Sequence, residues 1–403
     1  MLDVLLDAIW DRCVELWVTD RGYYVVSAPT GHLETLPELA DLRPDQPVEA
    51  LWEEIRRQSS LLIPTDVPVE TAVWIDARGR MWRATYFRSI HPIVVLRRVG
   101  FPFTTADYPE PFQRFVPTLI GEGRGLILMG GPIGGGKSAL LSVFLRELTR
   151  QPIGIGIYEE SLELDLPPDR AVVFHRLRGV HYQDLASALE SDRRVMLRAV
   201  AVQEVTEREV PALLHPIRMG RLVLTTMHAV SLRELLYRLS QAVGGSAVLA
   251  DMLTALIMVH LRSGVQGRII PVPSVFRPTG SVRISLERGD LDGALQAHEH
   301  DREGLDNLPE SVVLSWLEAQ GWIEPASAFH IGRTYIQEVQ GGSPLRRTIP
   351  GGLGLRFSAK VQVQGGTVNV LQIRPFRDEE ACARIQEAAR SWPDGFYQVE
   401  LTE

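Results

Sequence analysis

The alternation of apolar and polar positions changes twice along the 403-residue chain, so the chain is expected to have three parts. In the first hundred residues, short alternating runs are separated by glycine turns, which is typical of β-hairpins, and two segments have helical spacing. The expected elements are helices over 2–13 and 48–58 and strands over 16–18, 23–26, 71–75, 81–87 and 92–96. This pattern predicts an α+β domain with an antiparallel sheet.

From about Phe115 the pattern becomes an alternation of short apolar runs and longer helical segments, after a linker that holds Pro102, Pro109, Pro111 and Pro117. Such an alternation predicts a parallel sheet covered by helices. The expected strands are 126–129, 153–158, 172–174, 199–202, 222–225 and 268–271, and the expected helices are 138–150, 183–191, 207–218, 231–242 and 248–261.

The last hundred residues change character again. A helix is expected over 310–320, followed by a hairpin of residues 355–363 and 367–373 around a Gly-Gly turn. A further helix over 379–392 and a strand over 397–401 complete this part. The sequence thus predicts an N-terminal α+β domain (1–100), a linker (101–115), an α/β domain (116–300) and a small C-terminal α+β domain (301–403).

Composition narrows the function classes. The net charge of -8 and the pI near 5.8 argue against a general nucleic-acid binder. Two distant cysteines do not suggest a disulfide framework, and no apolar stretch reaches the roughly 20 residues that span a bilayer. The acidic residues among the first 17 do not fit a signal peptide. We therefore expect a cytoplasmic protein that meets a membrane only through partners.

The most informative stretch lies between the predicted strand 126–129 and the helix that begins near residue 138. It matches the pattern G-x-x-x-x-G-K-[ST] of loops that bind phosphate through backbone N–H groups. Lys137 is also one of only two lysines in the chain, the other being Lys360, where most cations are arginine. We therefore predict a nucleotide-binding loop made of Gly131, Pro132, Ile133, Gly134, Gly135, Gly136, Lys137, Ser138 and Ala139.

Hydrolysis requires more than a phosphate-binding loop, and polar residues follow three of the predicted strands. Ser138 supplies a hydroxyl suited to Mg²⁺, and carboxylates stand at Glu159, Glu160, Glu163 and Glu204, at the carboxyl ends of strands. His228 follows a third strand. Each has an ordinary alternative, since a Glu at a strand end is often solvated and a lone histidine is often a satisfied surface residue. Their arrangement after one loop favours an ATP and Mg²⁺ site.

Taken together, these motifs resemble the secretion and pilus ATPase superfamily, which includes pilus retraction motors and type IV secretion or conjugation ATPases. The matching segments follow one another in the same order as in that family. They are the loop at 124–132, an acidic box at 158–164, Gln203-Glu204 in place of a Walker B motif, a histidine box at 220–228, and the N-terminal segments 82–88 and 95–98. The resemblance implies a RecA-like core with a PAS-like N-terminal domain.

The resemblance also implies roles for individual residues. Glu163 polarises the attacking water, while Glu159 and Glu160 lie near the metal. Glu204 positions Mg²⁺ or water, and His228 senses the γ-phosphate. Arg83 and Arg97 approach the phosphates, either within the chain or from a neighbouring subunit. Plain surface charge is the alternative for both.

Several departures from the family pattern place the chain in a divergent branch. Gln203 stands where a Gly is usual, Ser161 where Pro is frequent, and Arg221 where many members have a first His. The expected function is that of a ring-forming, hexameric Mg-ATP hydrolase, peripheral to the inner membrane through its partners in a secretion, conjugation or pilus machine. A nucleic-acid translocase on the same core and a weakly active nucleotide-binding scaffold are the alternatives.

Overall fold

A computed structural model gives the fold as two compact units, residues 1–323 and residues 324–403. It describes the ranges 6–7, 9, 15–26, 33–34, 47–63, 69–76, 78–166, 169–265, 269–301 and 306–323, and the strands 345–350, 357–364, 367–374 and 395–402. The larger unit contains an antiparallel sheet followed by a mostly parallel one.

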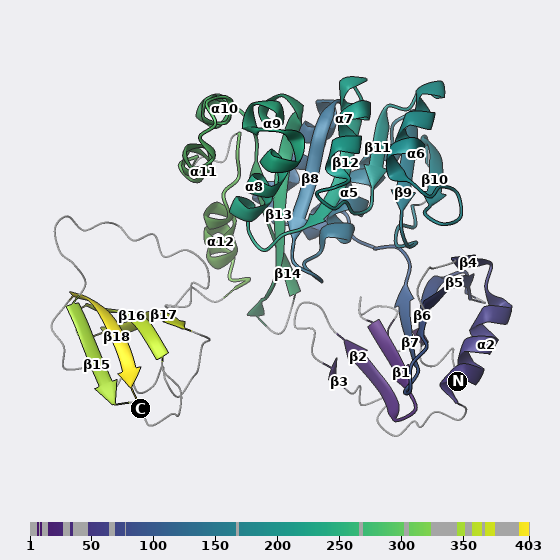
Figure 1. The fold of residues 1–403 in the computed structure, drawn as a ribbon, viewed down its shortest axis with the longest axis horizontal. Coiled ribbons are helices and arrows are strands. Elements are labelled where there is room, and N and C mark those ends of the chain that lie inside the picture. Colours follow the sequence, from purple (N-terminus) through teal and green to yellow (C-terminus); the bar gives the residue numbers. More distant parts are fainter. Residues whose placement is uncertain are drawn as a thin grey trace. The chain divides into compact units, whose positions relative to one another are not determined.

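The N-terminal sheet has seven antiparallel strands in the order β3-β2-β1-β7-β6-β5-β4 (Figure 1). Alternate side chains of its strands are buried, and they pack with Trp52 and its neighbours on helix α2. Both predicted hairpins and the helix over 48–58 are confirmed, whereas most of the segment 2–13 lies outside the described residues. The elements are β1 (Glu15–Thr19), β2 (Gly22–Val26), β3 (Leu33–Glu34), α2 (Val48–Gln58), β4 (Leu61–Ile63), β5 (Val69–Ile75), β6 (Met81–Phe87) and β7 (Ile93–Arg98).

Asp76 stabilises the turn between β5 and β6 through hydrogen bonds. Its carboxylate accepts hydrogen bonds from the backbone N–H groups of Arg78 and Arg80, both at 2.9 Å, and from the Trp82 indole N–H at 3.0 Å. The Arg80 guanidinium also donates to it at 2.6 Å. Burial alone would raise the pKa of Asp76, but these bonds lower it to about 2.

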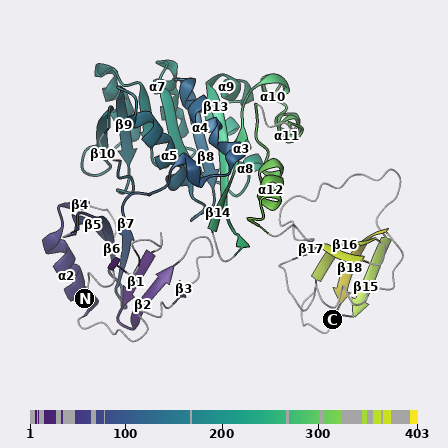
Figure 2. The ribbon, with the colours of Figure 1, turned by 180° about the vertical axis from the view of Figure 1, so that it is seen from behind.

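The second sheet has the order β10-β9-β11-β12-β8-β13-β14, parallel throughout except for the antiparallel pair β13 and β14. Helices lie on both of its faces (Figures 1 and 2). Its elements are β8 (Gly125–Gly131), α5 (Lys137–Thr149), β9 (Gly154–Glu159), β10 (Val172–Leu177), α6 (Leu185–Ser191), β11 (Ala199–Val202), α7 (Val210–Arg218), β12 (Leu222–His228), α8 (Leu232–Val243), α9 (Ser246–Met252), β13 (Leu253–Ser263), β14 (Ile269–Phe276), α10 (Gly280–Glu287) and α11 (Leu291–Glu299).

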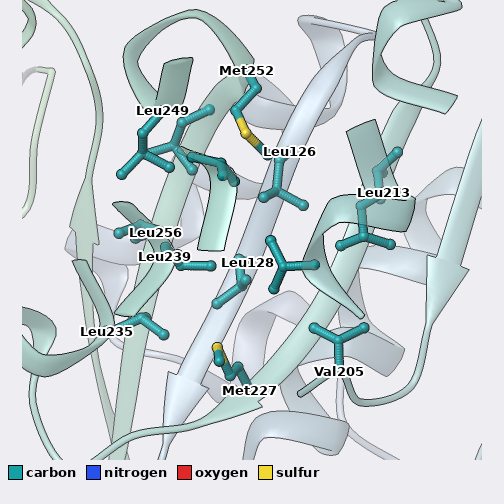
Figure 3. Packing of buried hydrophobic residues seen from close by; sticks show 14 of the residues in the cluster. Leu126, Leu128, Val205, Leu213, Met227, Leu235, Leu239, Leu249, Met252 and Leu256 are labelled. Carbon is teal, nitrogen blue, oxygen red and sulfur yellow. The ribbon is translucent and has the colours of Figure 1, made fainter. Parts of the chain in front are cut away.

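Successive residues of the central strand β8 belong to two separate cores. Leu126 and Leu128 point into a cluster with helices α6 to α11, part of which is drawn in Figure 3. Ile127 and Met129 point into the opposite cluster, formed with α5 and its neighbours. All four side chains are fully buried, which explains why this strand is continuously apolar. The predicted α/β core is therefore confirmed.

The predicted helix over 248–261 is wrong over most of its length. Helix α9 ends at Met252, and the chain continues directly into β13, which pairs with β8 on one side and β14 on the other. Residues 255–259 are all buried. A segment buried on both faces is uniformly apolar, so its sequence does not distinguish a strand from a helix.

The domain boundaries expected from the sequence also differ from those of the structure at both ends of the α/β domain. Within the predicted linker, Tyr108 and Phe112 are buried in the α/β core, the latter on helix α3 (Glu110–Gln113), and α4 (Phe115–Gly121) follows it. At the other end, α12 (Glu310–Ala319) packs Val313 and Leu317 into the same core. The larger unit therefore ends at Ile323 rather than near residue 300, because the apolar face of α12 is buried there.

The C-terminal unit is described by its backbone alone. Its four strands have the order β15-β18-β16-β17, with β15 and β18 parallel and the other pairs antiparallel. They are β15 (Leu345–Pro350), β16 (Phe357–Gln364), β17 (Thr367–Arg374) and β18 (Gly395–Thr402). The predicted hairpin and terminal strand are confirmed, β15 was not expected, and the predicted helix over 379–392 lies outside the described residues. Among the helices that the structure describes, none is long and apolar enough to cross a bilayer.

Candidate active site

The glycine-rich loop connects β8 to α5, as the sequence predicts. Gly134 and Gly136 have φ angles of 69° and 93°, a region that glycine occupies without strain. A Cβ atom at Gly131 would lie 2.5 Å from the Val259 carbonyl oxygen, so a larger residue would displace the strand behind the loop. The first N–H groups of the 13-residue helix α5 have no acceptor within the helix. The loop therefore fits a phosphate group.

Lys137, the first residue of α5, folds back over this loop. Its ammonium group donates to the carbonyl oxygens of Gly131 and Pro132 at 3.2 and 2.9 Å and contacts His228 Nδ1 at 2.9 Å. The side chain is buried. Burial lowers the pKa of Lys137, while the charges of Glu204 and Glu163 oppose this shift. The ammonium thus rests on backbone carbonyls at the position where a phosphate oxygen would compete for it.

His228 connects Lys137 to Glu204. Because an ammonium group only donates, Nδ1 of His228 is the acceptor in this contact, and its other nitrogen carries the proton. That nitrogen, Nε2, lies 2.9 Å from Glu204 Oε1. The three residues come from the end of β12, the start of α5 and the residue pair after β11. They form a continuous chain from a cation through a neutral imidazole to a carboxylate.

Glu163 is the second centre of the site. One of its oxygens, Oε1, accepts from Arg83 at 3.2 Å and from Arg97 at 3.0 Å. Burial alone would raise the pKa of Glu163, but the two arginines, followed by side-chain hydrogen bonds to Ser138 and Gln203, lower it. Glu163 is therefore ionised and is linked to the first turn of α5 through the Ser138 hydroxyl.

Arg83 and Arg97 lie on β6 and β7 of the N-terminal sheet. Arg83 also donates to the Ser161 hydroxyl at 2.7 Å, and Arg97 also pairs with Glu15. Both arginines thus reach the acidic box within the same chain. Within the chain both arginines are paired with Glu163, and their approach to the phosphates, from this chain or a neighbouring subunit, stays a prediction.

The other two carboxylates of the acidic box point elsewhere. Glu159 is fully buried and accepts from the backbone N–H groups of Glu163 and Leu164 at 3.0 and 3.1 Å, and it bonds His175. Burial raises the pKa of Glu159, and the bond to His175 opposes this shift. Glu160 is largely exposed and lies 4.0 Å from Arg178. Glu159 therefore holds the loop, and its oxygens are already occupied by protein donors.

A magnesium ion at this site would have few protein ligands. In the ranges that the structure describes, no three His, Cys, Asp or Glu side chains gather in a way that would hold a metal. Mg²⁺ in nucleotide sites keeps several waters and binds phosphate oxygens with one or two protein groups. The Ser138 hydroxyl, which is linked to the Glu163 carboxylate, is suited to be such a protein ligand. Glu204 is connected to Lys137 by the contacts that both make with His228.

Four residues at the site were not assigned a role from the sequence. They hold the acidic box or the arginines in place through the contacts above: Gln203, Ser161, His175 and Glu15. Gln203 and Ser161 were visible only as departures from the family pattern. Arg221, a third departure, is buried and donates to the Asp192 and Val195 carbonyl oxygens at 2.8 and 3.0 Å, so it supports the fold.

A glycine loop between a parallel strand and a helix, with carboxylates and a histidine at neighbouring strand ends, is the architecture of a P-loop site on a RecA-like core. Residues 92–283 match the family described as Type II/IV secretion system protein. Through this segment the chain is similar to the secretion and pilus ATPases, the superfamily that the motifs predicted.

One curated protein shows a similar likeness. The chain is 28% identical over 162 residues to a protein described as "Protein transport protein HofB homolog" from Escherichia coli (strain K12). That match covers 40% of this chain and about a third of the relative's length, 32%.

Solved structures extend the likeness over 80% of this chain. The pilus retraction motor PilT with bound ADP is 18% identical with a TM-score of 0.63 over 94% of that chain. The Legionella pneumophila ATPase DotB is 17% identical with a TM-score of 0.60 over 92% of that chain. At these identities the likeness concerns the fold, which includes the parallel core and the N-terminal domain.

Proposed function

We propose that the chain is a Mg²⁺-dependent ATP hydrolase that powers a cell-envelope machine of the type IV secretion, conjugation or pilus retraction kind. The observation that supports this proposal is that two separate sets of charged side chains meet at the glycine-rich loop. Lys137, His228 and Glu204 form one chain of contacts, and Glu163 reaches the loop through Ser138. The match of residues 92–283 to the Type II/IV secretion system family supports the same activity.

In this mechanism the N–H groups of the loop and of α5 bind the phosphates, and Lys137 exchanges the Gly131 and Pro132 carbonyl oxygens for phosphate oxygens. Mg²⁺, held through Ser138, would neutralise the charge that develops on the phosphates. Arg83 and Arg97, which bind Glu163, would turn from it toward the same phosphates. Glu163, then free to accept a proton, orients the attacking water.

His228 is the residue that reports on the occupied loop in this scheme. When Lys137 moves to a phosphate, the proton acceptor at His228 Nδ1 loses its donor, while Nε2 remains bonded to Glu204. A movement of Lys137 therefore changes the hydrogen bonding of His228, which contacts Glu204 after β11. This supports the sensor role that the family resemblance implies for His228.

We further propose a homo-hexameric ring that acts in the cytoplasm, next to inner-membrane proteins of the machine. This part rests on the superfamily, because the arginines that suggested a shared interface already meet Glu163 within one chain. A weakly active nucleotide-binding scaffold is the second candidate. It is favoured by one observation, namely that both arginines neutralise Glu163 and so weaken it as a proton acceptor.

Steady-state phosphate release from ATP and Mg²⁺ tests the proposal. Lys137→Ala should lower turnover more than about 100-fold and weaken nucleotide binding, because it removes the cation at the phosphates. Glu204→Ala should lower turnover while largely preserving binding. Arg193→Ala, which removes an exposed arginine paired with Glu190, is the matched control and should retain parent activity. Normal hydrolysis by Glu204→Ala would show that Glu204 has no part in the reaction, and no ATP turnover by the parent chain would favour the scaffold.

A further inference from the structure

Gln203 occupies a fixed position between two strand ends. It follows β11, its side chain is largely buried, and its backbone N–H donates to the Tyr158 carbonyl oxygen at 2.8 Å. Its own carbonyl oxygen accepts from the Thr226 hydroxyl at 2.5 Å. The backbone of this residue is therefore held by β9 on one side and β12 on the other, and the direction of its side chain is defined.

The side-chain amide of Gln203 joins three points of the acidic box. Its oxygen accepts from the backbone N–H groups of Glu160 and Ser161 at 3.2 and 3.4 Å. The same side chain lies near the Glu163 carboxylate and, through hydrogen bonding, helps to lower its pKa. A carboxylate accepts hydrogen bonds, so the NH₂ group of Gln203 is the donor there. The amide therefore supplies both an acceptor for the loop and a donor for the carboxylate from one side chain.

We propose that Gln203 is a positioning residue, which sets the place of the Glu163 carboxylate by bonding both that carboxylate and the backbone of the loop that carries it. The inference rests on the proposed ATP hydrolysis and adds to it a residue that acts through Glu163. This role of Gln203 explains how the acidic box, which has no regular secondary structure, holds the Glu163 carboxylate near Ser138 at the start of α5.

The acidic box has a second anchor, which separates positioning from folding. Glu159 accepts from the N–H groups of Glu163 and Leu164, so the far end of the loop is held independently of Gln203. Loss of the Gln203 amide therefore releases only the Glu160 and Ser161 end and one bond to Glu163. The rest of the loop and the nucleotide-binding glycines keep their contacts.

The test compares Gln203→Met, which has a similar length but no hydrogen bonds, with Gln203→Glu, which keeps an acceptor for the two N–H groups and loses the donor. For Gln203→Met we expect kcat to fall about tenfold, the size of one to two net hydrogen bonds, with KM within about twofold. Gln241→Met, a change at an exposed glutamine on α8, is the control and should match the parent.

Hydrogen–deuterium exchange of the nucleotide-free chain gives a readout that does not depend on turnover. In Gln203→Met, exchange at the N–H groups of Glu160 and Ser161 should increase about tenfold or more, because their acceptor is gone. In Gln203→Glu, that exchange should stay near the parent value while kcat still falls. This split between exchange and kcat is the signature of positioning.

Two results would overturn the inference. One is Gln203→Met with parent kcat and parent exchange at both N–H groups. The other is a loss of kcat accompanied by a lower melting temperature and faster exchange throughout the parallel sheet, which would assign Gln203 to the fold alone. If the parent chain does not hydrolyse ATP, the proposed function fails, and unchanged exchange in Gln203→Met would then separately refute the anchoring of the loop.

Discussion

Replacing Glu163 by Gln separates the two tasks that the structure gives to this carboxylate. In the structure, one oxygen of Glu163 accepts hydrogen bonds from both Arg83 and Arg97. The same carboxylate is proposed to accept a proton from water. The isosteric amide removes the charge and the proton acceptor, with little change in volume. Turnover should therefore fall, and nucleotide binding should become tighter.

The size of each effect follows from the contacts. A positioned general base contributes about 10²- to 10⁴-fold, so turnover should fall by at least about 100-fold. Hydrogen bonds between charged groups contribute about 1.5–3 kcal/mol each, less where solvent screens the pair, as for the partly exposed Arg97. An amide binds the arginines more weakly. If this lowers the cost of turning them toward phosphates by about 1–2 kcal/mol, ATP binds about 5- to 30-fold more tightly.

Phosphate release measures the first effect, and titration with a fluorescent ATP analogue measures the second. Glu190→Gln removes an exposed, surface-paired carboxylate on α6 and should leave both quantities unchanged. Hydrolysis at the parent rate in Glu163→Gln would refute the proposed role in water activation. Weaker nucleotide binding would show that the arginines are not held back by Glu163.

Two further predictions concern stability. Asp76→Asn should cost about 2 kcal/mol at pH 7, since the pKa of Asp76 is lowered from 3.8 to about 2. A lowered pKa stabilises the fold above pH 4, and this contribution is lost as the pH falls toward 2. The unfolding free energies of the parent and of Asp76→Asn should therefore become equal near pH 2. A difference that does not change with pH would contradict the reasoning. Leu128→Ala, at a fully buried position in the cluster of Figure 3, should cost about 2–5 kcal/mol by thermal denaturation, whereas Ile284→Ala, at a half-exposed position, should cost much less. Equal losses would show that the cluster is not tightly packed.

The sequence was sufficient for features whose chemistry is local. The loop ending in Lys137 and Ser138 was predicted because glycine spacing and flanking periodicity belong to one continuous stretch. The polar segments that follow the strands and carry Glu163, Glu204 and His228 were predicted because short apolar runs precede them. The antiparallel hairpins of the N-terminal sheet were predicted for the same reason, since a glycine turn joins neighbouring strands.

Only the tertiary structure decided features that depend on distant partners. β13 is a strand because β8 and β14 lie on either side of it, which its uniform apolar sequence does not show. Glu159 and Glu163 are both glutamates of one loop, yet one is buried beside His175 and the other meets two arginines from the N-terminal sheet. The sequence listed the carboxylates at this site, and their surroundings, set by contacts between residues far apart in the chain, determine which of them remains available for chemistry.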